Sequence, residues 1–199
     1  GSTQVEFDGK TLEFKGPYKR ISLFDSILEA TGVDISQMDE QALREQCKAW
    51  HIEVSPEMGR GKLIDEIFGE KVEASLIQPT FITDYPLIMT PLAKKHRNKE
   101  GLVERFELFI NGKEVANAYS ELNDPIDQRQ RFEDQLELAN RGDEDAMALD
   151  EDFLRALEYG MPPASGLGIG IDRLVMMLTG HRSIQEVLFF PQMRPQKDA

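Results

Sequence analysis

Apolar residues recur every three or four positions in three segments of residues 20–75, which predicts three amphipathic helices. Ser22 is placed to cap the first helix, and Gly32 to end it. Asp39 can cap the second helix, and the third should begin near Gly61. We interpret this block as a small helical insertion.

The spacing changes from helical to alternating after residue 75, which predicts strands. Residues 76–84 are rich in apolar and β-branched side chains, and residues 102–110 alternate between apolar and charged positions. Asn111-Gly112 separates that second run from residues 113–119, and both turn residues tolerate a positive φ. The sequence therefore predicts a β-hairpin with a two-residue turn.

Helical spacing returns in the last third of the chain. One helix should follow a cap at Asp124, and another should follow a cap at Asp150. The glycine-rich stretch 166–171 is expected to be a buried strand that leads into a helix over residues 172–179. These separated strands and helices indicate an α+β fold with an antiparallel β-sheet, and not an array of βαβ units.

The composition is that of a globular domain, since 40% of the 199 residues are hydrophobic and 30% are charged. The sequence holds no run of roughly 18 apolar residues, the length that a transmembrane helix needs, so we expect no membrane partner. The formal net charge of -13 argues against a stand-alone nucleic-acid-binding module, because phosphate backbones attract a basic surface.

The single cysteine, Cys47, excludes an internal disulfide and suits the reducing cytoplasm; we interpret it as a buried apolar filler. The three histidines have no metal-ligand spacing, which argues against a zinc site. We interpret residues 1–19 as an expression scar, Gly1-Ser2, followed by a leading strand or loop.

Two glutamates in the predicted hairpin are candidates for metal binding. With a two-residue turn, Phe109 pairs with Glu114, and Glu107 then pairs with Ala116. Glu107 and Glu114 would share one face of adjacent strands, where their charges repel unless a cation lies between them. A divalent cation that also binds phosphate oxygens would offset that repulsion. The alternative is two solvated acids on an exposed face.

Three polar residues further along the return strand have the opposite parity to Glu114. They are Asn117, Tyr119 and Glu121. Either they face away from the glutamates, or a β-bulge between Val115 and Asn117 turns them back, and bulges often lie beside active sites. The alternative is a polar sheet edge that leads into the next helix cap.

The stretch 166–173 carries a glycine at every second position, so its glycines share one face of a strand. A flat ligand or another backbone could approach that face closely. Arg173 lies in the first turn of the next helix, where a phosphate partner would suit its guanidinium. The alternative is tight packing of strand and helix, with a surface arginine. The stretch 59–62 fails as a phosphate-binding loop, because it lacks the required glycine spacing and hydroxyl residue.

Taken together, these segments resemble lysyl-tRNA synthetases. Residues 105–124 look like the substrate hairpin of that family, and residues 166–173 look like motif 3 of class II synthetases. Residues 76–86, 91–94 and 156–160 are also similar, and the resemblance runs from about residue 20 to residue 195. It implies that residues 76–199 form the C-terminal part of a class II catalytic domain, a partial antiparallel sheet with flanking helices.

The resemblance also implies roles for individual residues. Glu107 and Glu114 would hold Mg²⁺ against the phosphates of ATP, and Arg173 would be the catalytic arginine that binds an ATP phosphate. Asn117 would contact both ATP and lysine.

The lysine pocket implied by the same resemblance would include Tyr119, Glu121 and Gly168. Glu121 would meet the ε-ammonium group, since a cation that enters a partly dry pocket needs a carboxylate partner.

The implied parent enzyme is a homodimer that activates lysine with ATP and transfers it to tRNA(Lys). Motif 1, which forms the dimer in that family, and motif 2, which binds ATP, are not found in this sequence. We therefore expect a fragment with little or no ligase activity of its own. Two other interpretations remain: a tRNA-free paralogue that attaches lysine to a protein, and a non-catalytic interaction module.

Overall fold

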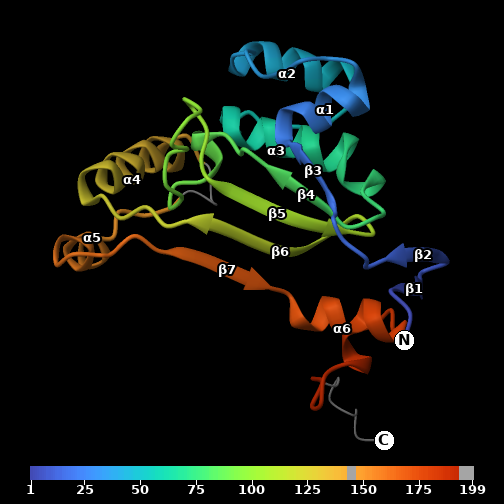
Figure 1. Ribbon diagram of the computed structural model, residues 1–199. Coiled ribbons are helices and arrows are strands. Elements are labelled where there is room, and N and C mark those ends of the chain that lie inside the picture. Colours follow the sequence, from blue (N-terminus) through green and yellow to red (C-terminus); the bar gives the residue numbers. More distant parts are fainter. Residues whose placement is uncertain (143–146, 193–199) are drawn as a thin grey trace, which may run out of the picture.

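The computed structural model describes residues 1–142 and 147–192, and a five-stranded sheet forms its centre (Figure 1). The strands, in spatial order, are β3 (Lys19–Ser22), β4 (Thr80–Thr83), β5 (Arg105–Ile110), β6 (Lys113–Ser120) and β7 (Ser165–Ile169). The three pairs from β4 to β7 are antiparallel, while β3 and β4 are parallel. The α+β class is confirmed, with one parallel pair that the sequence analysis did not foresee.

Three helices connect the parallel strands β3 and β4 and lie together beside that edge of the sheet (Figure 1). They are α1 (Leu23–Thr31), α2 (Glu40–Ala49) and α3 (Arg60–Lys71). The side chain of Ser22 accepts the N–H of Asp25, and the side chain of Asp39 accepts the N–H of Ala42. Gly32 ends α1 with a φ of 74°. The predicted caps and the end of α1 are therefore confirmed.

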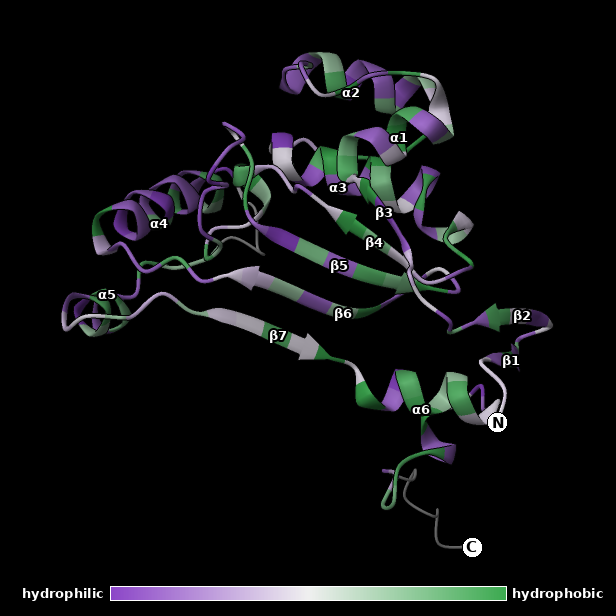
Figure 2. Cartoon of the chain, in the orientation of Figure 1, coloured by the Kyte–Doolittle hydropathy of each residue, from purple (hydrophilic) through white to green (hydrophobic). Residues whose placement is uncertain are grey.

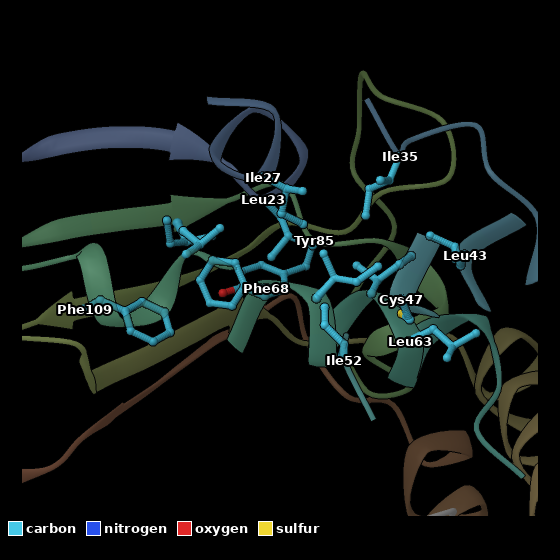
Figure 3. Packing of buried hydrophobic residues seen from close by; sticks show 14 of the residues in the cluster. Leu23, Ile27, Ile35, Leu43, Cys47, Ile52, Leu63, Phe68, Tyr85 and Phe109 are labelled. Carbon is cyan, nitrogen blue, oxygen red and sulfur yellow. The ribbon is translucent and has the colours of Figure 1, made fainter. Parts of the chain in front are cut away.

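A single hydrophobic core joins these helices to the sheet. Ile27, Cys47 and Ile64 from the helices belong to the same buried cluster as Ile82 and Phe109 from the strands. Figure 3 shows this cluster from close by, with Cys47 among the aliphatic side chains, as predicted. The helices therefore pack on the sheet face that also carries Glu107, beside the hairpin strands of the candidate glutamates.

A second, smaller core lies at the opposite end of the sheet. The hairpin of β1 (Gln4–Phe7) and β2 (Lys10–Glu13) packs there against α6 (Ile171–Thr179). Phe7, Leu12, Ile110, Val115 and Met177 form this core. It fixes α6, and thus Arg173, to the start of β6.

The described part of the chain also contains two further α-helices and three short 3₁₀ segments. Helix α4 (Pro125–Asn140) begins at Asp124 and α5 (Glu151–Glu158) begins at Asp150, and both aspartates accept a backbone N–H as predicted. Three short 3₁₀ segments occur at η1 (Glu73–Ser75), η2 (Leu87–Met89) and η3 (Ile184–Glu186). No helix among the described residues has the length and apolar character needed to cross a lipid bilayer.

Strand β7 is exposed, so the prediction of a buried glycine-rich strand is wrong. Leu167 is 61% exposed and Ile169 is 47% exposed, because β7 pairs only with β6 among the described residues and lies at the sheet edge. In Figure 2, β5 alternates between hydrophilic and hydrophobic colours, whereas β7 is mostly pale. Runs of apolar residues and glycine suggest burial, but the sequence of a strand does not reveal which neighbours it has.

Replacing Phe68 by alanine should test whether the helices and the sheet unfold together. Phe68 is 4% exposed and its ring contacts Phe109 edge-on, with centroids 5.4 Å apart (Figure 3). We expect the free energy of unfolding to fall by about 3–5 kcal/mol, in one transition seen by both circular dichroism and tryptophan fluorescence. Glu29→Ala, which removes an exposed ion pair with Lys19, should cost far less. Two separate transitions would contradict a shared core.

Candidate functional site

A β-bulge at Val115 determines which side chains share the site. In the hairpin, Phe109 pairs with Glu114 as predicted, but Leu108 pairs with Ala116 and leaves Val115 without an opposite residue. Glu107 therefore pairs with Asn117, and the prediction that it pairs with Ala116 is wrong. The extra residue reverses the alternation of side chains on β6 beyond this point.

The bulge places the polar residues of β6 on the face that carries the glutamates. Phe109 and Glu114 form one cross-strand pair, and Glu107 shares the parity of Phe109 along β5. Beyond the bulge, Asn117 lies opposite Glu107 and Tyr119 lies opposite Arg105. Glu107 and Arg105 lie on the same face of β5 as Phe109. The bulge that the sequence analysis left as one of two alternatives is thus confirmed.

Two contacts hold the bulge against the start of α6. The N–H of Gly170 donates to the carbonyl of Val115 at 2.8 Å, and the guanidinium of Arg173 donates to the carbonyl of Glu114. The side chain of Arg173 is otherwise exposed. Its cationic group therefore lies beside the backbone of Glu114, where it remains open to solvent and to an anionic ligand.

Glu107 is not a solvated acid, because its side chain is only 12% exposed and fully hydrogen-bonded. The hydroxyl of Tyr85 donates to its Oε2 at 2.7 Å. Its Oε1 accepts from the guanidinium of Arg105 and from Nδ2 of Asn117, the latter at 3.3 Å. The alternative of two exposed acids is therefore wrong for Glu107, whereas Glu114 is half-buried.

Burial raises the pKa of the Glu107 carboxyl above its ordinary value, and the charges of Glu114 and Asp65 act in the same direction. Arg105 and the hydroxyl of Tyr85 oppose that change by favouring the carboxylate. Burial also raises the pKa of Tyr85, and the charge of Glu107 adds to the effect. The site thus concentrates negative charge in a partly dry environment that a bound cation would stabilise.

Tyr85 and Arg105 belong to the site although neither was predicted from the sequence. The guanidinium carbon of Arg105 lies 4.5 Å from the centroid of the Tyr85 ring, so one arginine binds both the ring and Glu107. Arg105 precedes Glu107 by two residues on β5, and strand alternation alone could have identified it. Tyr85 follows β4 and reaches the site through tertiary packing, for which the local sequence gives no signal.

A cavity of about 980 Å³ adjoins this carboxylate pair. Glu107 and Glu114 line it from the sheet, and Lys62, Asp65 and Glu70 line it from α3. Its lining does not include Asn117 and Tyr119 further along β6, or Glu121 just after that strand. The predicted site therefore has two neighbouring parts, one at the carboxylate pair and one further along β6.

The second part of the site lies where β6 meets β7. Asn117 pairs with Gly168 and Tyr119 pairs with Gly166, so these glycines lie beside the polar side chains of β6. A cavity of about 600 Å³ touches Tyr119 and Gly166, but Phe106, Ala118 and Leu167 also line it, so it opens on the opposite face of the sheet from Glu107. Burial raises the pKa of Tyr119, and the negative charge of Glu121 adds to the increase.

The carboxylate pair fits a divalent cation that shares its coordination with a ligand. No group of three or more His, Cys, Asp or Glu side chains that could hold a metal occurs in the described part of the chain. Glu107 and Glu114 would therefore supply two carboxylates, and other oxygen atoms must complete the coordination. Mg²⁺ is commonly bound in this way, by one or two carboxylates together with phosphate oxygens and water.

Comparison with known proteins assigns this arrangement to a family. The family described as "tRNA synthetases class II (D, K and N)" matches residues 2–194. The chain is 63% identical over all 199 residues to a protein of Porphyromonas gingivalis strain W83, and 62% identical over all 199 residues to one of Christiangramia forsetii. Both are named lysine–tRNA ligase, and the matched part covers 34% and 35% of their lengths.

A third relative extends the same pattern. A lysine–tRNA ligase of Azobacteroides pseudotrichonymphae is 62% identical over 197 residues, which cover 99% of this chain and 39% of that protein. The chain thus spans somewhat more than a third of the length of the curated relatives it matches. Since the family match covers nearly every residue, this chain belongs to the class II tRNA synthetases of the D, K and N group.

Proposed function

We propose that this chain is the C-terminal part of the catalytic domain of a lysine–tRNA ligase and contributes residues to the ATP and lysine sites. The main support is the bulge at Val115, which brings the carboxylate pair and the polar residues of β6 to one face. The lysine–tRNA ligases that share 62–63% of its residues support the choice of amino acid.

In the proposed site, Glu107 and Glu114 hold Mg²⁺ together with the phosphates of ATP. The metal, when bound, neutralises charge on the phosphates. Tyr85 and Arg105 fix the orientation of Glu107 through hydrogen bonds to both of its oxygens. Arg173 binds a phosphate oxygen and stabilises the charge that develops there, since its exposed guanidinium already lies beside Glu114.

The lysine substrate lies further along β6 in this proposal. The carboxylate of Glu121 binds the ε-ammonium group, while Tyr119 lines the pocket and Asn117 contacts both lysine and ATP. Gly168 lies opposite Asn117, and a Cβ at Gly168 would meet no atom closer than the Asn117 carbonyl oxygen at 3.8 Å. A side chain at Gly168 would thus make only an ordinary van der Waals contact, so a ligand can approach the strand there.

The proposed reaction of the parent enzyme has two steps. A lysine carboxylate oxygen attacks the α-phosphorus of ATP, the bond to the bridging oxygen breaks, and pyrophosphate leaves as lysyl-adenylate forms. A hydroxyl group at the 3′ end of tRNA(Lys) then attacks the adenylate carbonyl, and AMP leaves. Neither step requires a covalent bond to the protein, so positioning and electrostatics supply the catalysis.

The remaining assignments belong to the same proposal. We propose a cytoplasmic parent enzyme that takes part in protein biosynthesis as a homodimer. We also propose a division into a leading segment (1–19), a helical insertion (20–75) and the catalytic part (76–199), of which residues 143–146 and 193–199 lie outside the described structure. The insertion packs on the sheet through one core, so it contributes to the stability of the catalytic part.

Glu114→Gln should weaken metal binding without unfolding the chain. The change removes one charge at a half-buried position and keeps the size of the side chain. We expect the affinity for Mn²⁺ in the presence of ATP, measured by electron paramagnetic resonance, to fall at least about tenfold. Glu70→Gln is the matched control, because Glu70 lines the same cavity from α3 outside the carboxylate pair. Equal losses in both variants would contradict the assignment.

Glu121→Gln should weaken lysine binding, which calorimetry of the 199-residue chain with lysine and Mg²⁺-ATP can measure. Loss of a charged hydrogen-bond partner should weaken binding roughly 10- to 100-fold. Glu158→Gln changes the same residue type on the exposed surface of α5 and should leave the affinity unchanged. A folded chain that binds no lysine, or that binds it equally well after Glu121→Gln, would contradict the proposed pocket.

A further inference from the structure

The carboxylate of Glu121 lies directly over the backbone of Gly166 on the neighbouring strand. A Cβ built on Gly166 would overlap Oε1 of Glu121 and would lie 3.4 Å from its carboxyl carbon. The backbone N–H of Glu121 donates to the carbonyl of Ala164 at 3.0 Å, so the start of β7 holds both the main chain and the side chain of Glu121. The side chain can occupy this position only because residue 166 has no Cβ.

The other glycines of this stretch are not restricted in the same way. At Gly168 the nearest atom to an added Cβ is a backbone oxygen at 3.8 Å, and at Gly170 it is a backbone oxygen at 3.5 Å. Both distances are ordinary van der Waals contacts. Of these three glycines, only Gly166 lies against the side chain of Glu121, the residue that follows β6. The close contact that an added Cβ would make at position 166 is therefore with the Glu121 side chain.

The backbone conformation does not explain the glycine. Gly166 is absent from the glycines with a positive φ, so alanine can adopt its main-chain geometry. It forms an ordinary antiparallel pair with Tyr119 in the β6–β7 ladder. Alanine at this position would thus be accepted by the strand and would conflict only with the carboxylate of Glu121.

We propose that Gly166 is a positioning residue that determines where Glu121 presents its carboxylate, and hence how tightly the site binds a substrate ammonium group. A single added methyl group forces the flexible Glu121 side chain into another rotamer, because the backbone of β7 cannot yield as easily. The ammonium part of this inference rests on the proposed lysine function. The displacement of the Glu121 side chain by a Cβ at position 166 does not depend on that function.

A double-mutant cycle of Gly166→Ala and Glu121→Gln in the 199-residue chain tests both parts. We expect Gly166→Ala to weaken lysine binding about as much as Glu121→Gln does, by roughly tenfold or more. In the Glu121→Gln variant, Gly166→Ala should cause little further loss of affinity for lysine. Ser165→Ala is the matched control, since Ser165 is an exposed neighbour on the same strand with opposite parity. Losses that simply add would overturn the proposal.

The titration of Tyr119 supplies a readout that is independent of lysine. Since the charge of Glu121 contributes to the raised pKa of Tyr119, a displaced carboxylate must change that pKa. The chain has four tyrosines, so the ¹³C-labelled Tyr119 ring can be assigned by NMR with a Tyr119→Phe variant. We expect Gly166→Ala to change the Tyr119 pKa in the wild-type background and to leave it unchanged in the Glu121→Gln background.

The two readouts separate the two proposals. A coupled change in the Tyr119 pKa, in a chain that binds no lysine, would support the positioning role of Gly166 and contradict the lysine function. An unchanged Tyr119 pKa, or the same change with Gln at position 121, would overturn the positioning role even if lysine binds.

Discussion

The site depends on one unpaired residue in a hairpin. Val115 has no opposite residue on β5, and this bulge reverses the alternation of side chains on β6. In a regular hairpin, Asn117 would point away from Glu107, and the carboxylate pair and the polar residues of β6 would occupy opposite faces. The carbonyls on either side of the bulge accept from Gly170 and Arg173, so the irregular pairing leaves neither acceptor unsatisfied.

The rest of the molecule also holds this hairpin at its turn. At the turn, the N–H groups of Asn111 and Gly112 each donate at 2.9 Å to the carbonyls of Ile77 and Leu76, respectively. A Cβ at Gly112 would lie 3.3 Å from the Cα of Ala74, so the turn also packs closely against η1. Bonds from both turn residues to one segment favour a single register, and register determines which side chains reach the site.

Local signals in the sequence predicted local structure well. The caps at Ser22, Asp39 and Asp124, and the Asn111-Gly112 turn, are each determined by a few adjacent residues. The location of the bulge depends on contacts between β6 and the start of α6, which are distant in sequence. The alternation of side chains along β6 therefore left two alternatives, a regular strand or a strand with a bulge. The exposure of β7 depends on its position in the sheet, and the contact of Tyr85 with Glu107 depends on packing.

The contacts of Glu107 explain why a buried carboxylate is tolerated before any ligand binds. A partly buried carboxylate without partners would strongly destabilise the folded state. Here Arg105 supplies a positive charge to Glu107, and Tyr85 supplies a hydroxyl donor. The ring of Tyr85 also stacks on the guanidinium of Arg105, so each partner orients the other. A cation that binds Glu107 must therefore compete with Arg105 for the same carboxylate, and only the additional charge of Glu114 and of phosphate can make that exchange favourable.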